Sequence, residues 1–413
     1  MATALANPPI ALAPSETDWL TRAIVFTPVV GATLLAKISI TPLGAHGIGI
    51  VGPLTCAALV LGLASGRMLV VPRRLLLYLI MLSVLGLIQV LRGDAFSISS
   101  IALMAALGAS YIFAVSDERV DSALAMRFFG DLTTAIALFG ICQFLLQFVA
   151  GTAAVFPIET YVPEAARTLG FHNIGPLYWG SPVLKSNGFV MLEPSELSQL
   201  CALGLIVELA GKSRALRLAL YAGAMIVSYS GTGLIVLAAS LPLLAVLYRR
   251  WNLLLPGLVF VGIAALFAGP LHLDVLLNRA SEFDSRGSSG FARFVGWRDL
   301  FDEQLWNSTS AALFGHGAGS FFEAAARYSA AEMSYSKIIF EFGVLGALLY
   351  FAFLFYCVFR TSAPFIVRFA VAVAFLMNGA YATTVPCVTL SLLLWPSAAP
   401  ARRSHPRLVG ATA

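Results

Sequence analysis

Long runs of apolar residues, separated by short polar or charged turns, dominate this chain. A bilayer-spanning helix needs about 20 mostly apolar residues. The pattern predicts twelve such segments, at residues 22–40, 48–65, 74–91, 98–115, 128–150, 187–210, 214–229, 231–248, 252–269, 335–359, 364–381 and 383–396. Two longer connections, at about 151–186 and 270–333, interrupt the pattern; connections of that length are often functional.

Composition agrees with a chain folded in lipid. The sequence is 59% hydrophobic and 11% charged, whereas a soluble globular domain carries about a quarter charged residues. One water-soluble core could not bury so much apolar surface. We therefore expect an all-α, polytopic membrane protein of about twelve helices. Residues 1–21 lack the charged-then-apolar order of a cleavable signal, so the first helix should be retained. We expect the N-terminus and the tail 397–413 to be disordered.

The distribution of Lys and Arg predicts the orientation. Short connections rich in these residues stay in the cytoplasm. If all twelve segments span, such connections fall on one side with both termini; their basic residues are Arg22, Arg67, Arg73, Arg74, Arg119, Arg127, Lys212, Arg214, Arg217, Arg249, Arg250, Arg360, Arg368, Arg402, Arg403 and Arg407. The connections 151–186 and 270–333 then face the exterior, which in a Gram-negative cell is the periplasm.

Several function classes find no support. The net charge of +5 comes from dispersed residues and forms no basic stripe for nucleic acid. The five histidines are scattered, and no Cys/His spacing fits zinc. Phosphate-binding Gly-Lys loops and dinucleotide fingerprints are absent from the sequence. We therefore expect no metal, no cofactor and no direct use of ATP.

The sixth predicted segment carries acidic residues inside the membrane. Glu193 lies about 9 Å from its outer end, at 1.5 Å per residue, and intramembrane acids are usually functional. Glu196 follows at i+3, and two poorly solvated carboxylates raise the pKa of at least one, which suits a proton acceptor. Pro194 can kink or start the helix. These features predict a polar cavity that opens outward; the alternative is a kink whose acids reach interfacial water.

The connection 270–333 concentrates arginine, although external loops normally carry few basic residues. Its arginines are Arg279, Arg286, Arg293, Arg298 and Arg327. Residues 288–301 read as a serine-capped amphipathic helix, which we expect to lie in the membrane surface.

A planar guanidinium binds phosphate through two hydrogen bonds, so Arg279, Arg293 and Arg298 are candidate ligands of a lipid-linked pyrophosphate. Local salt bridges remain the alternative, because the connection also holds eight acidic residues. Arg298 has Asp299 beside it in the sequence, and Arg327 has Glu323.

Further along, glycines surround His316 in the run Gly315-His316-Gly317-Ala318-Gly319. Glycine lets a backbone turn sharply or approach a ligand, and histidine carries protons near neutral pH. His316 and Glu332 are therefore further candidates for the catalytic base, after Glu193. A solvated loop histidine is the simpler alternative for His316.

Four pieces of the chain together resemble the bacterial O-antigen ligase and polysaccharide polymerase (Wzy-type) superfamily, over about 185–360. These pieces are Asn187-Gly188-Phe189 with Glu193-Pro194-Ser195 and Ser198; Ser228-Tyr229-Ser230-Gly231-Thr232-Gly233; Ser289-Gly290 with Arg293 and Trp297, followed by Leu313-Phe314-Gly315-His316-Gly317 and Gly319; and Tyr335 through Glu341-Phe342-Gly343-Val344-Leu345-Gly346. The predicted topology is also similar to that of the family.

The resemblance implies a GT-C-like membrane glycosyltransferase at the outer face of the bacterial inner membrane. Members of the family transfer a glycan from undecaprenyl pyrophosphate to a sugar hydroxyl without a metal, with arginines stabilising the leaving group. The implied partners are lipid-linked glycans and membrane lipids, together with a flippase and a chain-length or export complex.

One departure separates two activities within that family. Ligases typically carry a His-Asn pair just before the helix that holds Glu341, and this chain has Glu332-Met333 there. The departure favours a polymerase of exopolysaccharide or O-antigen over an O-antigen ligase. From another class, a transporter or lipid-carrier flippase should show repeated halves, and the sequence shows none.

Overall fold

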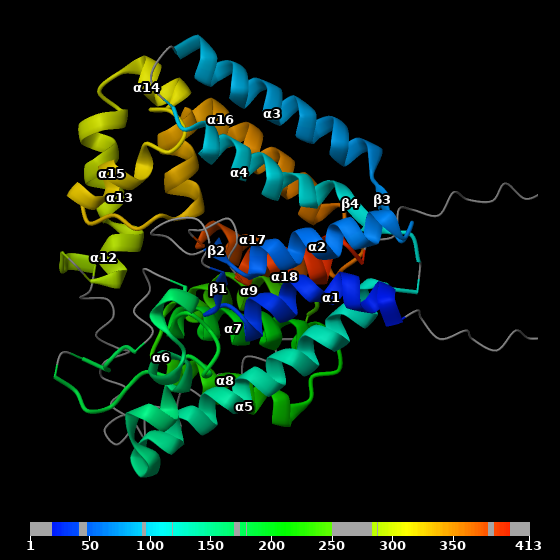
Figure 1. Ribbon diagram of the computed structural model, residues 1–413, viewed down its shortest axis with the longest axis vertical. Coiled ribbons are helices and arrows are strands. Elements are labelled where there is room, and N and C mark those ends of the chain that lie inside the picture. Colours follow the sequence, from blue (N-terminus) through cyan, green and yellow to red (C-terminus); the bar gives the residue numbers. More distant parts are fainter. Residues whose placement is uncertain are drawn as a thin grey trace, which may run out of the picture.

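The computed structural model describes residues 19–40, 48–92, 96–117, 119–168, 174–178, 180–249, 283–286, 288–378 and 384–396. The chain is mostly helical, with few strands (Figure 1). By length and composition, three helical runs can cross a membrane: Pro72–Arg92, Ser122–Tyr161 and Ser334–Phe359. Shorter apolar helices accompany them over the described residues. The helical character and the presence of apolar helices long enough to span are thus confirmed, whereas the predicted segment 252–269 and Arg279 lie outside the described residues.

The helices follow the apolar segments closely. In chain order they are α1 (Trp19–Leu34), α2 (Val51–Ala64), α3 (Pro72–Arg92), α4 (Ile98–Ala109), η1 (Ser110–Ile112), α5 (Ser122–Val155), α6 (Pro157–Tyr161), η2 (Glu164–Ala166), α7 (Pro194–Ala210), α8 (Ala215–Ser228), α9 (Thr232–Leu247), α12 (Ser289–Phe294), α13 (Gly296–Leu300), η5 (Phe301–Leu305), α14 (Thr309–Phe314), α15 (Phe321–Arg327), α16 (Ser334–Phe359), α17 (Phe365–Leu376), α18 (Thr384–Val388) and η6 (Thr389–Leu394).

Two short strand pairs, which the sequence pattern did not predict, accompany the helices. Strand β1 (Ser39–Ile40) pairs antiparallel with β2 (Ile48–Gly49), and β3 (Met68–Val70) pairs with β4 (Phe113–Val115). Both pairs lie where a helix ends and backbone groups need partners outside it. The hydropathy pattern does not reveal these strands, because their residues are mostly apolar and continue the neighbouring predicted helical segments.

Helix α5 is longer than the segment 128–150 predicted. It runs to Val155 through Gly151, which has φ +73°. Gly151 is non-helical and kinks the run, so the start of the connection 151–186 is a short helical stretch beyond that kink.

The centre of the molecule is α7, which packs against α5, α8, α9 and α17. Its residues from Leu197 to Leu209 are nearly all buried. Helices α7 and α9 cross closely because Gly233 has no side chain. A Cβ at this position would overlap the main chain of Ser198. The first turns of α7 and α9 therefore lie side by side.

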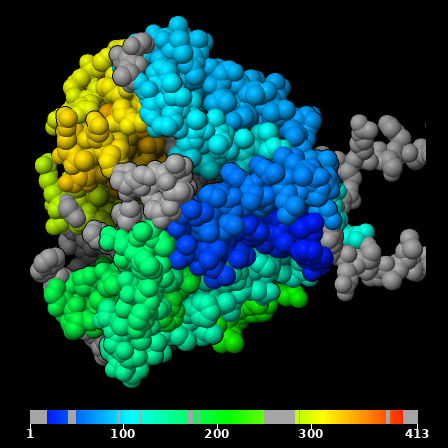
Figure 2. All heavy atoms as spheres, viewed as in Figure 1, coloured from blue at the N-terminus to red at the C-terminus, as the bar shows by residue number. Residues whose placement is uncertain are grey.

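Residues 288–333 form a compact helical segment, and residues 283–286 contact it through Phe283 and Arg286; we call both stretches together the outer segment. Its apolar residues Leu300, Phe301 and Phe321 pack with Phe340 of α16, so they face protein, contrary to the expected helix in the membrane surface. The expected single helix 288–301 is also broken, at Val295, into α12 and α13. In Figure 2 the outer segment lies against the α3–α4 side of the molecule, where Gln89 accepts a hydrogen bond from the amide of Ala318 (2.8 Å).

Candidate functional site

Glu193 stands at the N-cap of α7, in extended backbone, with Pro194 at the first helical position. The prediction that the helix begins near Asn187 is therefore wrong. Proline suits the first turn of a helix, where its missing N–H costs nothing. Residues before it are not helical, since Gly188 has φ +70° and Phe189 has φ +65°. Glu193 is thus presented at the mouth of α7.

Gln143 of α5 holds the non-helical stretch, which we call the entry segment (186–193). Its side-chain oxygen accepts hydrogen bonds from the Ser186 hydroxyl (2.7 Å), the Asn187 amide (2.9 Å) and the Gly188 amide (2.8 Å). Gln143 is buried. Sequence reasoning overlooked it, although a glutamine within an apolar helix is itself a signal of a polar contact.

Glu193 and Arg293 meet, although a hundred positions separate them. The Arg293 guanidinium lies 2.9 Å from Glu193 Oε2, and the Ser195 hydroxyl donates to the same oxygen at 2.7 Å. The Glu193 side chain is 30% exposed, and the Arg293 side chain is 21% exposed. An ion pair that still reaches solvent can exchange one partner for a ligand. Arg293 lies in the last turn of α12. The outer segment therefore contributes the cation of this pair, and the N-cap of α7 contributes the acid.

Glu196 plays a different part from Glu193. One of its oxygens accepts a hydrogen bond from the Leu192 amide at 3.2 Å. An acid in the first turn that reaches back to the preceding backbone resembles a capping box. Glu196 therefore ties down the start of α7.

A small open hollow adjoins the ion pair. Its lining comes from the first turn of α9, from Phe283 and from α12, and comprises Ser230, Gly231, Thr232, Ile235, Phe283, Ser289, Gly290, Arg293 and Phe294. Helix α9 begins beside this hollow with Gly231 as its N-cap, and its first amides, of Thr232 and Gly233, donate to the hydroxyls of Ser230 and Ser198. Arginine and hydroxyl groups together suit an anion such as phosphate.

Glu332 lies in a second ion cluster. Lys337 Nζ is 2.6 Å from Glu332 and 3.0 Å from Glu341. The cluster adjoins the Arg293 site, because the Ala331 amide donates to the Ala292 carbonyl at 2.7 Å. Sequence reasoning did not foresee Lys337, although a lysine near the start of an apolar helix was visible.

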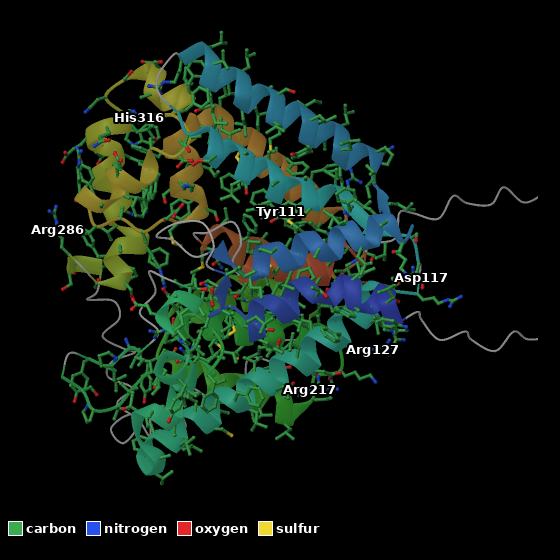
Figure 3. The ribbon with its side chains drawn as sticks, viewed as in Figure 1. Tyr111, Asp117, Arg127, Arg217, Arg286 and His316 are labelled. Atoms are coloured by element: carbon green, nitrogen blue, oxygen red, sulfur yellow. The ribbon has the colours of Figure 1, made fainter. Side chains whose placement is uncertain are left out.

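His316 is not brought to the ion pair. Its ring stacks on Phe340 at 4.7 Å and lies 3.2 Å from the Gln304 carbonyl. In Figure 3 it sits near α14, whereas α12 occupies the other end of the outer segment in Figure 1. The glycines around it serve packing: a Cβ at Gly315 would overlap the main chain of Glu341, and one at Gly343 that of Leu313.

Arg298 is exposed and stacks near Trp297, 5.8 Å from its ring centroid. The local salt bridge considered for it is not the one seen, since Asp299 pairs with Arg286 at 3.0 Å. Within the described residues no group of three His, Cys, Asp or Glu side chains is placed to hold a metal ion.

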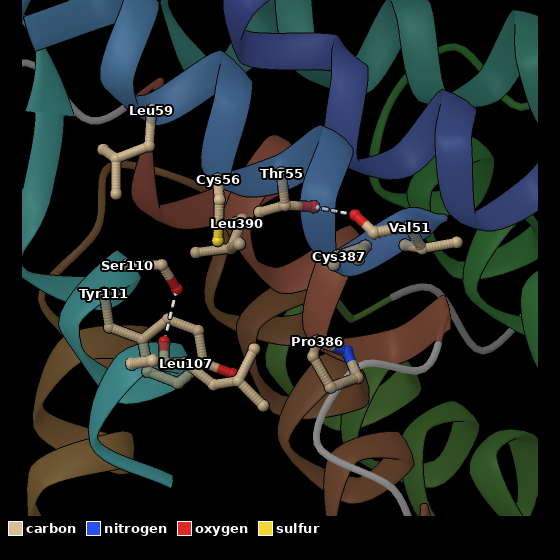
Figure 4. A pocket seen from close by; sticks show the side chains of 12 residues that line it. Val51, Thr55, Cys56, Leu59, Leu107, Ser110, Tyr111, Pro386, Cys387 and Leu390 are labelled. Carbon is tan, nitrogen blue, oxygen red and sulfur yellow. Dashed lines mark hydrogen bonds between the residues drawn. The ribbon is translucent and has the colours of Figure 1, made fainter. Parts of the chain in front are cut away.

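A second hollow lies away from this chemistry, between α2, α4 and α18 (Figure 4). Its lining is mostly apolar and includes Leu59 and Leu390. The hydroxyls of Thr55 and Ser110 donate to carbonyls of their own turns, Val51 at 2.8 Å and Leu107 at 2.5 Å. These two hydroxyls are therefore satisfied within their own helices.

Comparison with protein-family models, with curated protein sequences and with solved structures finds no match for this chain.

Proposed function

We propose that this protein polymerises undecaprenyl-pyrophosphate-linked repeat units of exopolysaccharide or O-antigen at the periplasmic face of the bacterial inner membrane. The observation that carries the proposal is the Glu193–Arg293 pair beside an anion-compatible hollow. The resemblance of the surrounding motifs to the Wzy-type superfamily adds the substrate class. Twelve spans, a GT-C-like arrangement and an external outer segment belong to the same proposal.

The leaving group of such a donor is already activated, so catalysis needs positioning and charge stabilisation. Donor pyrophosphate would enter the hollow and take the Arg293 guanidinium from Glu193. Arg279 and Arg298 are further candidate ligands for it.

Release of Arg293 would free Glu193 to act as the base. The acceptor hydroxyl oxygen attacks the anomeric carbon while the bond from that carbon to the pyrophosphate oxygen breaks. The pyrophosphate keeps the electron pair, and Glu193 takes the hydroxyl proton. Attack opposite the leaving group inverts the anomeric centre. Glu332, which pairs with Lys337, remains the alternative base. The placement of His316 in the glycine turn, away from the ion pair, weakens the case for that residue.

The test is polymerisation of a lipid-linked repeat unit by the purified protein. Arg293→Ala and Glu193→Gln should each lower the rate about 100-fold or more, as loss of a charge-stabilising group or a base does. Arg286→Ala is the matched control, because Arg286 is an outer-segment arginine, 80% exposed and paired with Asp299. It should keep the wild-type rate. Full activity in both site variants would refute the assignment.

An O-antigen ligase is the alternative within the same chemistry. Lipopolysaccharide banding after gene deletion separates the two. Loss of a polymerase leaves single repeats or no long chains, whereas loss of a ligase leaves long chains on the lipid carrier.

A further inference from the structure

Lys37 is a buried cation that the proposed mechanism does not use. It follows α1 directly, and its side chain is 1% exposed. Its Nζ lies 2.6 Å from Glu159 Oε1 and donates to the Phe189 carbonyl at 2.6 Å. Glu159 belongs to α6, and its side chain is 5% exposed. A buried ion pair thus grips the backbone of the entry segment.

The backbone at Phe189, to which Lys37 donates, has a conformation that needs support from other residues. Phe189 has φ +65°, a left-handed conformation that is unfavourable for a bulky side chain. Gln143 fixes the preceding residues Asn187 and Gly188. Lys37 fixes the Phe189 carbonyl, four residues before Glu193. The two side chains therefore hold the entry segment from opposite ends of its left-handed turn.

The charge of Lys37 also reaches the acids. Lys37 lies close enough to Glu196 for their charges to interact, and Glu196 binds the Leu192 amide next to Glu193. Chain order makes this arrangement unforeseeable, because Lys37 follows α1, Glu159 lies in α6 and Phe189 lies in the entry segment before α7. Two buried charges stabilise a fold little compared with apolar residues. The Lys37–Glu159 pair nevertheless occupies this position, where it binds one backbone carbonyl.

We propose that Lys37, supported by Glu159, is a positioning residue that sets the place of the Glu193 carboxylate for glycan transfer. This inference rests on the proposed function. Lys37 touches no substrate; it acts through the Phe189 carbonyl and the entry segment. Its removal should misplace the acid while leaving the donor-binding Arg293 and the hollow in place.

The experiment compares Lys37→Met and Glu159→Gln with a matched control, Glu208→Gln. Glu208 is equally buried, at 3% exposed, and pairs with Arg214 at 2.8 Å at the opposite end of α7. Hydrogen exchange of the purified full chain is measured by mass spectrometry, and transfer kinetics are measured with the lipid-linked repeat unit. Glu159→Gln keeps the test informative should Lys37→Met fail to fold.

Lys37→Met should speed exchange in the peptide covering 187–197 about tenfold, as expected when a local support is lost. It should lower kcat about 100-fold and leave KM for the donor unchanged. Glu159→Gln should act in the same direction but less strongly, and Glu208→Gln should change neither the exchange of this peptide nor kcat.

Unchanged exchange at 187–197 in Lys37→Met would overturn the inference. Equal acceleration in peptides of α3 and α16 would also overturn it, because the pair would then support the fold as a whole. Wild-type kcat in Lys37→Met would refute the link to catalysis. Absence of transfer by the wild-type protein would count against the proposed function alone, since exchange tests the positioning without turnover.

Discussion

At the residue scale, the environment of Glu193 is made by near and distant neighbours together. Ser195 donates to its carboxylate from two positions away, and Arg293 pairs with it from the outer segment. Glu196, only three residues further, faces the backbone of Leu192. Two acids that look equivalent in the sequence thus have different partners, and only one of them contacts a cation that a substrate could claim.

This difference predicts a split between Glu193→Gln and Glu196→Gln. A glutamine at 196 can still accept the Leu192 amide, so the start of α7 is kept and transfer should fall by less than about tenfold. A glutamine at 193 cannot take the acceptor proton, and the rate should fall by about 100-fold or more. Initial rates at matched protein concentration measure both. A larger loss for Glu196→Gln would reverse the roles of the two acids.

At the element scale, α16 and the glycine turn at 315–319 lock together through their main chains. The His316 amide donates to the Phe340 carbonyl at 2.8 Å, and the Gly317 amide donates to the Glu341 carbonyl at 3.0 Å. This contact occurs beside a non-helical Gly343, with φ +69°. Helix α16 also carries Lys337, so this main-chain contact sets the position of the second ion cluster. It sets the position of α12 as well, because the Tyr335 hydroxyl of α16 donates to the Arg293 carbonyl at 2.8 Å.

Alanine at Gly315 or Gly343 should therefore destabilise the protein strongly. Each position combines a positive φ with a Cβ that would overlap backbone, and we expect a loss of about 3 kcal/mol or more in the free energy of unfolding. The control is Gly86→Ala in α3, where a Cβ meets nothing within 4 Å and alanine should stabilise the helix by up to about 1 kcal/mol. Thermal unfolding in detergent compares the three midpoints. Equal midpoints for all three variants would show that the lock is dispensable.

At the scale of the whole molecule, the site depends on how segments far apart in the chain are arranged relative to one another. In Figure 3 Arg286 and His316 mark the outer segment at one end of the molecule, and Arg127 and Arg217 lie at the other. Arg217 belongs to a charged cluster in which it pairs with Asp131, and Arg214 pairs with Glu208. These ion pairs join α8 and its N-cap Arg214 to α5 and α7.

The predicted orientation can be tested by cysteine labelling in a background without the native cysteines. A membrane-impermeant maleimide should label Arg286→Cys in cells with a permeabilised outer membrane, because we expect the outer segment to be external. Lys212→Cys, in the exposed turn between α7 and α8, should react only after lysis. The opposite pattern would place the ion pair and its hollow inside the cell and remove the proposed function.

The sequence by itself determined the helical class and the approximate positions of many helices, because these depend on local apolar runs. It also singled out two segments in which charges stand out of place. Glu193 and Arg293 could be singled out because each stands where its residue type is unfavourable. The catalytic roles of these residues stay predictions, and Arg279 lies outside the described residues.

Only the tertiary structure decided which of the flagged residues meet. Burial of apolar surface fixes how α7, α9, α12 and α16 pack, and that packing brings Arg293 to Glu193 while His316 stacks on Phe340. Lys37, Gln143 and Lys337 gained their importance in the same way, since a buried polar group must find a partner wherever packing supplies one. The strand pairs likewise followed from backbone groups that needed partners outside their own segments.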